Sequence, residues 1–126
     1  MKLLFFIAAG GAFGAIGRYA VMATVGQING AVFPYGTILV NVGGSLALGA
    51  AVELMALIWS PSEEIKAFFV VGLLGAFTTF SAFSLDVVVL LKREELFFAA
   101  LYVVVSVVLS VAAFFLATIA FRHIFT

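Results

Sequence analysis

Three hydroxyl-bearing side chains recur at every fourth position near the end of the chain: Tyr102, Ser106 and Ser110. In an α-helix this spacing places them on one face, one above the other. A single serine in an apolar helix ordinarily bonds back to its own backbone. Three hydroxyls in register instead form a row of hydrogen-bond donors, which suits a species that moves along the helix.

Two phenylalanines, Phe80 and Phe83, stand three residues apart beside Thr78, Thr79 and Ser81. Phenylalanine in an apolar helix usually faces lipid or packs in the core, and the pair alone indicates no function. Among these hydroxyls, however, the pair could line a path. Aromatic rings have positive edges, which offer an anion weak contacts, and weak contacts suit conduction because the ion must also leave.

Four polar residues lie within otherwise apolar stretches, where each is costly in hydrocarbon. Asn41 could either make an interhelical hydrogen bond or line a pathway, and its position favours neither. Arg18 could reach the membrane interface or face a vestibule, where it would raise the local anion concentration. Asp86 needs a partner, a proton or water, and Glu53 is expected near the end of its segment.

Catalytic and soluble classes are excluded by composition. The only histidine is His123, near the C-terminus, and there is no cysteine, so neither a nucleophile–histidine pair nor a thiolate metal site is available. Six basic and six acidic residues balance, which argues against a nucleic-acid partner. With 66% hydrophobic and only 10% charged residues, the outer surface must be mostly apolar, as only lipid tolerates. We expect a membrane protein that is not an enzyme.

Four segments are long enough to cross a bilayer, which takes about 20 mostly apolar residues. They are Leu3–Val25, Gly36–Trp59, Pro61–Leu91 and Leu96–Phe121. The first fifteen residues resemble a signal peptide, but the apolar run continues past Ala15, so a retained helix is the better interpretation. Short connections predict antiparallel neighbours in one all-α domain spanning residues 1–126.

The third segment is too long for a simple span. About 31 residues give roughly 46 Å of helix, against a hydrocarbon core of roughly 30 Å. Its centre, from Gly75 to Ser81, is rich in Gly, Thr, Ser and Phe, which are poorer helix formers than Ala or Leu. A break near the middle of the membrane explains both features. Such a break is tolerated only where protein or water covers it, so it is a candidate site.

Local signals predict two further features. Gly26 to Pro34 carries turn formers and is expected to be the first loop. Ser60 is expected to cap the third helix, with Pro61 at its first position and Glu63 completing the cap. Small residues predict close helix packing on the first two spans: Gly10, Gly11, Gly14, Gly17, Gly43, Gly44 and Gly49.

Basic residues are divided equally between the two sides of the membrane. Four crossings put one set on the side of both termini and the other set opposite: Lys2, Lys66 and Arg122, against Arg18, Lys92 and Arg93. The positive-inside rule then has no excess to act on. We expect insertion in both orientations and an antiparallel two-fold homodimer. The alternative is a weak bias set by His123 or by folding order.

Three stretches, Gly14–Tyr19, Gly36–Asn41 and Gly75–Ser84, resemble the bacterial fluoride-channel family called Fluc or CrcB. The resemblance covers essentially the whole chain in motif order, and its most specific part is Thr-Thr-Phe-Ser-x-Phe-Ser. It implies a dual-topology antiparallel homodimer of four-helix subunits, each with a broken third helix, in the bacterial inner membrane. Such a dimer has two fluoride pores and exports toxic fluoride passively.

The resemblance also implies residue roles. The pore would comprise two phenylalanines, a fluoride-coordinating amide and a polar track: Phe80, Phe83, Asn41, Tyr102, Ser106 and Ser110. A structural sodium ion at the dimer centre would be held by backbone carbonyls of Gly75 and Thr78 from both subunits. Arg18 matches a basic position and is assigned to the vestibule. Three residues depart from the small or polar types expected: Ala76, Phe77 and Ala82.

Two other function classes compete with the channel. A small dual-topology proton-coupled multidrug exporter has the same size, but it needs a deep carboxylate, for which Asp86 is the only candidate. A non-transporting scaffold would explain the glycine faces. It would not explain the central Thr/Phe/Ser segment or the row of hydroxyls.

Overall fold

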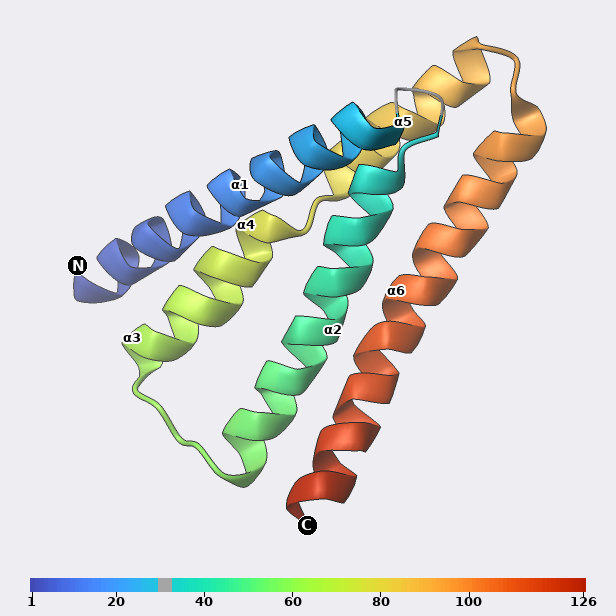
Figure 1. Ribbon diagram of the computed structural model, residues 1–126. Coiled ribbons are helices and arrows are strands. Elements are labelled where there is room, and N and C mark those ends of the chain that lie inside the picture. Colours follow the sequence, from blue (N-terminus) through green and yellow to red (C-terminus); the bar gives the residue numbers. More distant parts are fainter. Residues whose placement is uncertain (30–32) are drawn as a thin grey trace.

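The computed structural model describes residues 1–29 and 33–126. These residues form helices without a strand: α1 (Lys2–Asn29), α2 (Tyr35–Leu57), α3 (Glu63–Lys66), the π-helical η1 (Ala67–Leu74), α4 (Gly75–Phe77), α5 (Phe80–Lys92) and α6 (Leu96–Phe125) (Figure 1). The segments α3 to α5 follow one another along a single passage. The fold is therefore all-helical, with four passages long and apolar enough to cross a membrane, as predicted.

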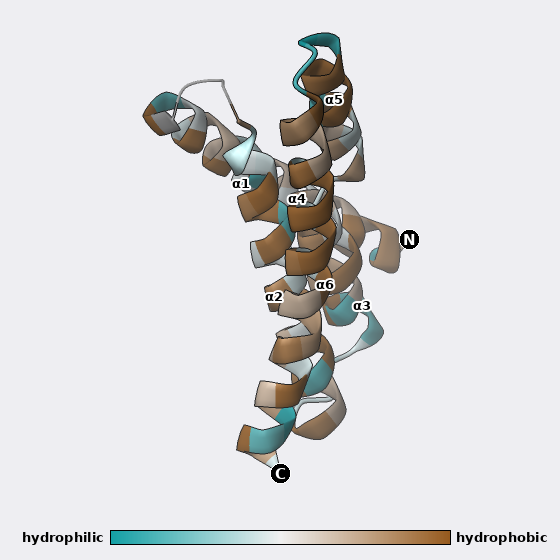
Figure 2. Cartoon of the chain, turned by 90° about the vertical axis from the view of Figure 1, so that its right-hand side faces the viewer, coloured by the Kyte–Doolittle hydropathy of each residue, from teal (hydrophilic) through white to brown (hydrophobic). Residues whose placement is uncertain are grey.

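The outer surface of this bundle is apolar. Hydrophobic residues cover most of the helices, and hydrophilic residues gather near the C-terminus, around α3 and in the turn after α5 (Figure 2). Large side chains such as Phe97 are widely exposed. Few residues within each span are buried by the chain itself. Because water does not tolerate such a surface, lipid or another chain must cover it.

The closest helix pairs are not consecutive in sequence. α1 packs along η1, and α2 packs along α6 (Figure 1). α2 and α6 also run in the same direction, because the chain crosses back through the third passage between the end of α2 and the start of α6. The predicted contacts between consecutive helices are present for α1–α2 and α5–α6, but they are less extensive than those of the two pairs above.

Glycines allow α1 and η1 to approach with their backbones in contact. A Cβ atom at Gly10 would collide with the carbonyl oxygen of Phe68, and one at Gly14 with that of Leu73. A Cβ atom on Gly72 would lie 2.6 Å from a carbonyl oxygen of α1. Small residues permit this proximity where apolar lipid provides no hydrophobic drive for helix association. The packing role predicted for Gly10 and Gly14 is confirmed.

Several predicted boundaries are wrong. Helix α1 continues to Asn29, so the residues from Gly26 are helical rather than part of a loop, and 30–32 lie outside the described residues. The cap of α3 is Ser62, whose hydroxyl accepts a hydrogen bond from the Ile65 amide at 3.4 Å, and not Ser60. Starting two residues beyond Pro61, at Glu63, places two glutamates in the first turn, where the helix dipole favours acidic groups.

The third passage leaves helical geometry at two threonines. Thr78 has φ −80° and ψ 156°, and Thr79 has φ −151° and ψ 120°, both extended. The Thr79 hydroxyl then caps α5 by accepting a hydrogen bond from the Ala82 amide at 3.0 Å. Threonine favours such positions because its side chain competes for backbone groups.

Candidate functional site

The interruption between α4 and α5 is held by Asn41 of α2. Its Nδ2 donates to the Thr79 carbonyl at 2.9 Å, and its Oδ1 accepts from the Thr79 amide at 2.7 Å. The side chain therefore satisfies both backbone groups of one extended residue, as a neighbouring strand would. This is the interhelical hydrogen bond that was one of two predicted roles for Asn41. A primary amide has two donor hydrogens, so a second N–H is still available.

Two carbonyl groups lose their helical partners as a result. In a continuous helix the Thr79 amide would bond to the Gly75 carbonyl, but Asn41 accepts it instead. The Ala82 amide would likewise bond to the Thr78 carbonyl, but it donates to the Thr79 hydroxyl. The interruption thus frees carbonyl oxygens at Gly75 and Thr78.

Arg18 caps the end of α4. Its Nε donates to the Ala76 carbonyl at 3.0 Å, which places a cation at the negative end of a helix. Sequence suggested either the membrane interface or a vestibule, and neither anticipated this contact. The guanidinium has five N–H donors, so this bond leaves others for water or an anion.

A groove of about 320 Å³ opens between the interruption, α2 and α6. Its lining residues are Asn41, Ser45, Thr78, Thr79, Phe80, Phe83, Ser106, Val107, Ser110 and Val111. The structure therefore brings together five of the six predicted pore residues, all except Tyr102. Ser106 is buried, and its hydroxyl has no hydrogen-bond partner among residues 1–29 and 33–126. A buried donor of this kind calls for a bound water or ion.

Tyr102 lies behind the groove. It is fully buried, its hydroxyl donates to Asp86 Oδ2 at 2.8 Å, and its ring stacks on Phe83 at 5.3 Å between centroids. Thr37 donates to the same carboxylate oxygen at 2.7 Å. Asp86 thus has the partners that its position in the membrane required. Tyr102 supports a groove residue through Phe83 rather than lining the groove.

The family model described as CrcB-like protein, camphor resistance (CrcB), matches residues 5–118. The chain belongs to the CrcB family. A relative from Rhodospirillum centenum is 46% identical over 115 residues, covering 91% of each chain. One from Nitrobacter winogradskyi is 48% identical over 107 residues, covering 85% of each. Both relatives are named fluoride-specific ion channel FluC.

The CrcB match confirms the resemblance inferred from the three motifs and includes every residue of the groove. Together with the four apolar passages, it makes the chain a multi-pass membrane protein. Sequence reasoning missed Thr37 and Ser45 as neighbours of the site. Both are single hydroxyls in an apolar helix, and neither carries a distinguishing pattern. Thr37 is identified only by its hydrogen bond to Asp86, and Ser45 only by its place in the groove beside the interruption.

Proposed function

We propose that the protein is a fluoride-selective channel that lets fluoride leave the cell passively. The observation that carries the proposal is the groove at the interruption, which exposes hydroxyl and amide donors and two phenylalanines along one path. The names of the relatives supply the ion. Since those relatives are named channels, we assign no enzymatic activity.

The groove has the chemistry that a small anion requires. Ser106, Ser110 and the second amide hydrogen of Asn41 can each donate a hydrogen bond to fluoride in place of water. Phe80 and Phe83 add weak contacts through their ring edges. None of the described residues that line the groove is charged. Binding therefore stays loose enough for release, as conduction demands.

The proposal is tested with purified protein in liposomes loaded with fluoride and, separately, with chloride. We expect rapid fluoride release without a proton gradient and no chloride release, recorded with ion-selective electrodes. Fluoride release that requires a proton gradient, or no fluoride release at all, would overturn the channel. The hydrogen bonds to Asp86 from Thr37 and Tyr102 already weigh against a carboxylate that cycles protons freely.

We further propose that the functional unit is an antiparallel homodimer in which the interrupted helix crosses the membrane midplane. In the single chain the groove is open along one side, and Phe80 is 77% exposed. A second copy would close it. Arg18 bonds at the interruption, and the other basic residues are nearly balanced between the two sides, Lys2, Lys66 and Arg122 against Lys92 and Arg93, which supports opposed orientations.

A sodium ion at the dimer centre is part of this proposal. Gly75 and Thr78 offer carbonyl oxygens that no longer bond within a helix, and a hard cation takes oxygen ligands. Ala76 lies between them and departs from the residue type that the resemblance led us to expect. Its carbonyl accepts a hydrogen bond from Arg18, so this departure does not affect the carbonyl oxygens of Gly75 and Thr78 that would bind sodium. Two such carbonyls from each subunit would surround the ion.

Cysteine crosslinking tests the dimer and the ion together. We expect single cysteines on opposite ends of the helices to trap pairs of opposite orientation. The yield after heating should be higher in sodium than in potassium. Exclusively parallel pairs would overturn the antiparallel dimer. Equal yields in the two salts would overturn the sodium site alone.

A further inference from the structure

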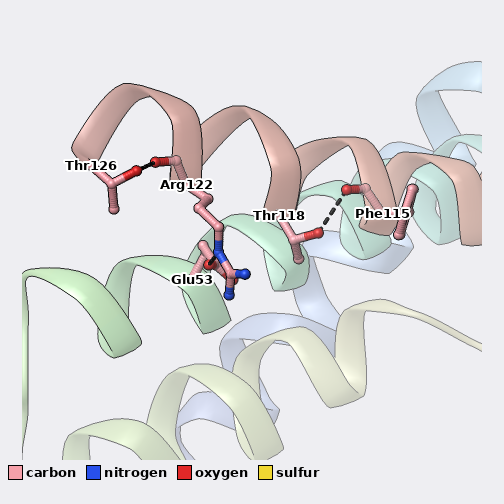
Figure 3. Close-up of polar contacts among 5 residues, drawn as sticks. All are labelled: Glu53, Phe115, Thr118, Arg122 and Thr126. Carbon is pink, nitrogen blue, oxygen red and sulfur yellow. Dashed lines mark hydrogen bonds and ion pairs between the residues drawn. The ribbon is translucent and has the colours of Figure 1, made fainter.

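An ion pair between two membrane-spanning helices lies outside the site described above. The carboxylate of Glu53, on α2, accepts a hydrogen bond from Arg122 Nε of α6, and the two atoms are 2.6 Å apart (Figure 3). Both residues belong to helices that can span the membrane. An ionisable side chain in such a helix is expensive to bury, so it indicates a function unless its partner explains it.

The two members of the pair differ strongly in exposure. The Glu53 side chain is 7% exposed, whereas that of Arg122 is 70% exposed. The carboxylate is thus buried against α6, and the guanidinium lies at the surface. The contact is made through Nε, and the two terminal nitrogens of the guanidinium carry four further N–H donors. A pair built only to fasten two helices has no need of so exposed a cation.

The pair lies beyond one end of the groove. A second hollow shares Ser45 and Ser110 with the groove and continues it along α6 to Phe115. Thr118 follows, with its hydroxyl donating to the Phe115 carbonyl at 2.7 Å, and Arg122 is one turn further. Thr118 and Arg122 project from the same side of α6 (Figure 3).

We infer that Arg122 attracts anions to the mouth of the fluoride path, meaning the end of the path that lies beyond Phe115 on α6. Glu53 is the positioning residue that holds Arg122 there. The inference rests on the proposed channel function. The pair is neutral as a whole, but its positive end is exposed and its negative end is buried, so its field attracts anions at short range, within a Debye length. Glu53 keeps the long side chain of Arg122 beside the mouth and offsets part of its charge, so that fluoride is attracted without being trapped.

The packing of the two helices does not depend on this pair. Gly49 already brings α2 onto α6, where a Cβ atom would lie 2.5 Å from the Phe114 carbonyl oxygen and 3.1 Å from the Ala117 side chain. Glu53 is one turn beyond that contact. The ion pair therefore adds charge at a place where close packing has already aligned the helices.

The test measures fluoride efflux from liposomes of uncharged lipid at about 10 mM and about 1 M ionic strength, where the Debye lengths are roughly 30 Å and 3 Å. We expect Arg122→Gln to lower efflux about two- to threefold at low ionic strength and not at high ionic strength. Arg122→Lys should retain efflux, and Glu53→Gln should raise it at low ionic strength. The charge swap Glu53→Arg with Arg122→Glu should fall below Arg122→Gln.

Each outcome decides the inference. A loss in Arg122→Gln that is equal at both ionic strengths, or full recovery in the charge swap, would mean that the pair only fastens the helices. No change in any variant would also overturn it. Melting temperatures of the purified variants show whether a loss reflects misfolding. If the wild-type protein itself moves no fluoride, the proposed channel fails, which is a separate result.

Discussion

Replacement of both Phe80 and Phe83 by isoleucine is expected to reduce fluoride efflux about 30-fold while leaving the protein folded. Isoleucine keeps an apolar side chain of substantial size but has no quadrupole, so both ring-edge contacts with the anion disappear. Each such contact contributes about 1 kcal/mol, and 1.4 kcal/mol is tenfold in a rate. The rings adjoin at 5.4 Å between centroids and both line the groove, so the losses fall on the same path.

The chain provides a matched control for this double variant. Phe97 and Phe98 are also adjoining, at 5.6 Å between ring centroids, and exposed, but they lie at the start of α6 and do not line the groove. Their double replacement by isoleucine should leave efflux unchanged. Liposome efflux and gel filtration are measured for both variants. Equal efflux from the two would show that the Phe80–Phe83 pair is not part of the path.

Length and apolar character predicted the four passages well, because lipid forces every backbone polar group into a helix. The groove was predictable in part. Hydroxyls four residues apart do share a helical face, but each step of four residues turns the face by about 40°. Ser106 and Ser110 therefore reach the groove, whereas Tyr102, two steps from Ser110, is rotated toward Asp86.

The partners of polar residues could not be predicted. Arg18 bonds to a carbonyl 58 positions away, and Glu53 bonds to a residue 69 positions away. A single sequence shows that such residues need partners, because burial without one is costly. It does not show which helices pass beside one another. Here α1 meets the third passage and α2 meets α6, an arrangement that loop lengths did not indicate.

Substitution of Asn41 by aspartate is expected to have the other large effect, on stability and efflux together. The side chain keeps its shape, but Nδ2 becomes an acceptor facing the Thr79 carbonyl oxygen, where a 2.9 Å hydrogen bond stood before. Losing that bond and leaving the carbonyl unpaired costs about 1–3 kcal/mol. The new negative charge also lies on the groove. At roughly 5 Å and an effective dielectric constant of about 20, it repels an anion by about 3 kcal/mol, or more than 100-fold.

Asn41→Ala separates the two effects, since it removes both bonds to Thr79 without adding charge. We expect it to lower the melting temperature about as much as Asn41→Asp, with a smaller loss of efflux. Ser45→Ala is the matched control, because Ser45 lines the same groove one turn further along α2; its melting temperature should stay close to that of the wild type. If Asn41→Asp melts and conducts like the wild type, Asn41 cannot be what holds the chain extended at Thr79, and the carbonyls of Gly75 and Thr78 must be freed by the threonine side chains alone.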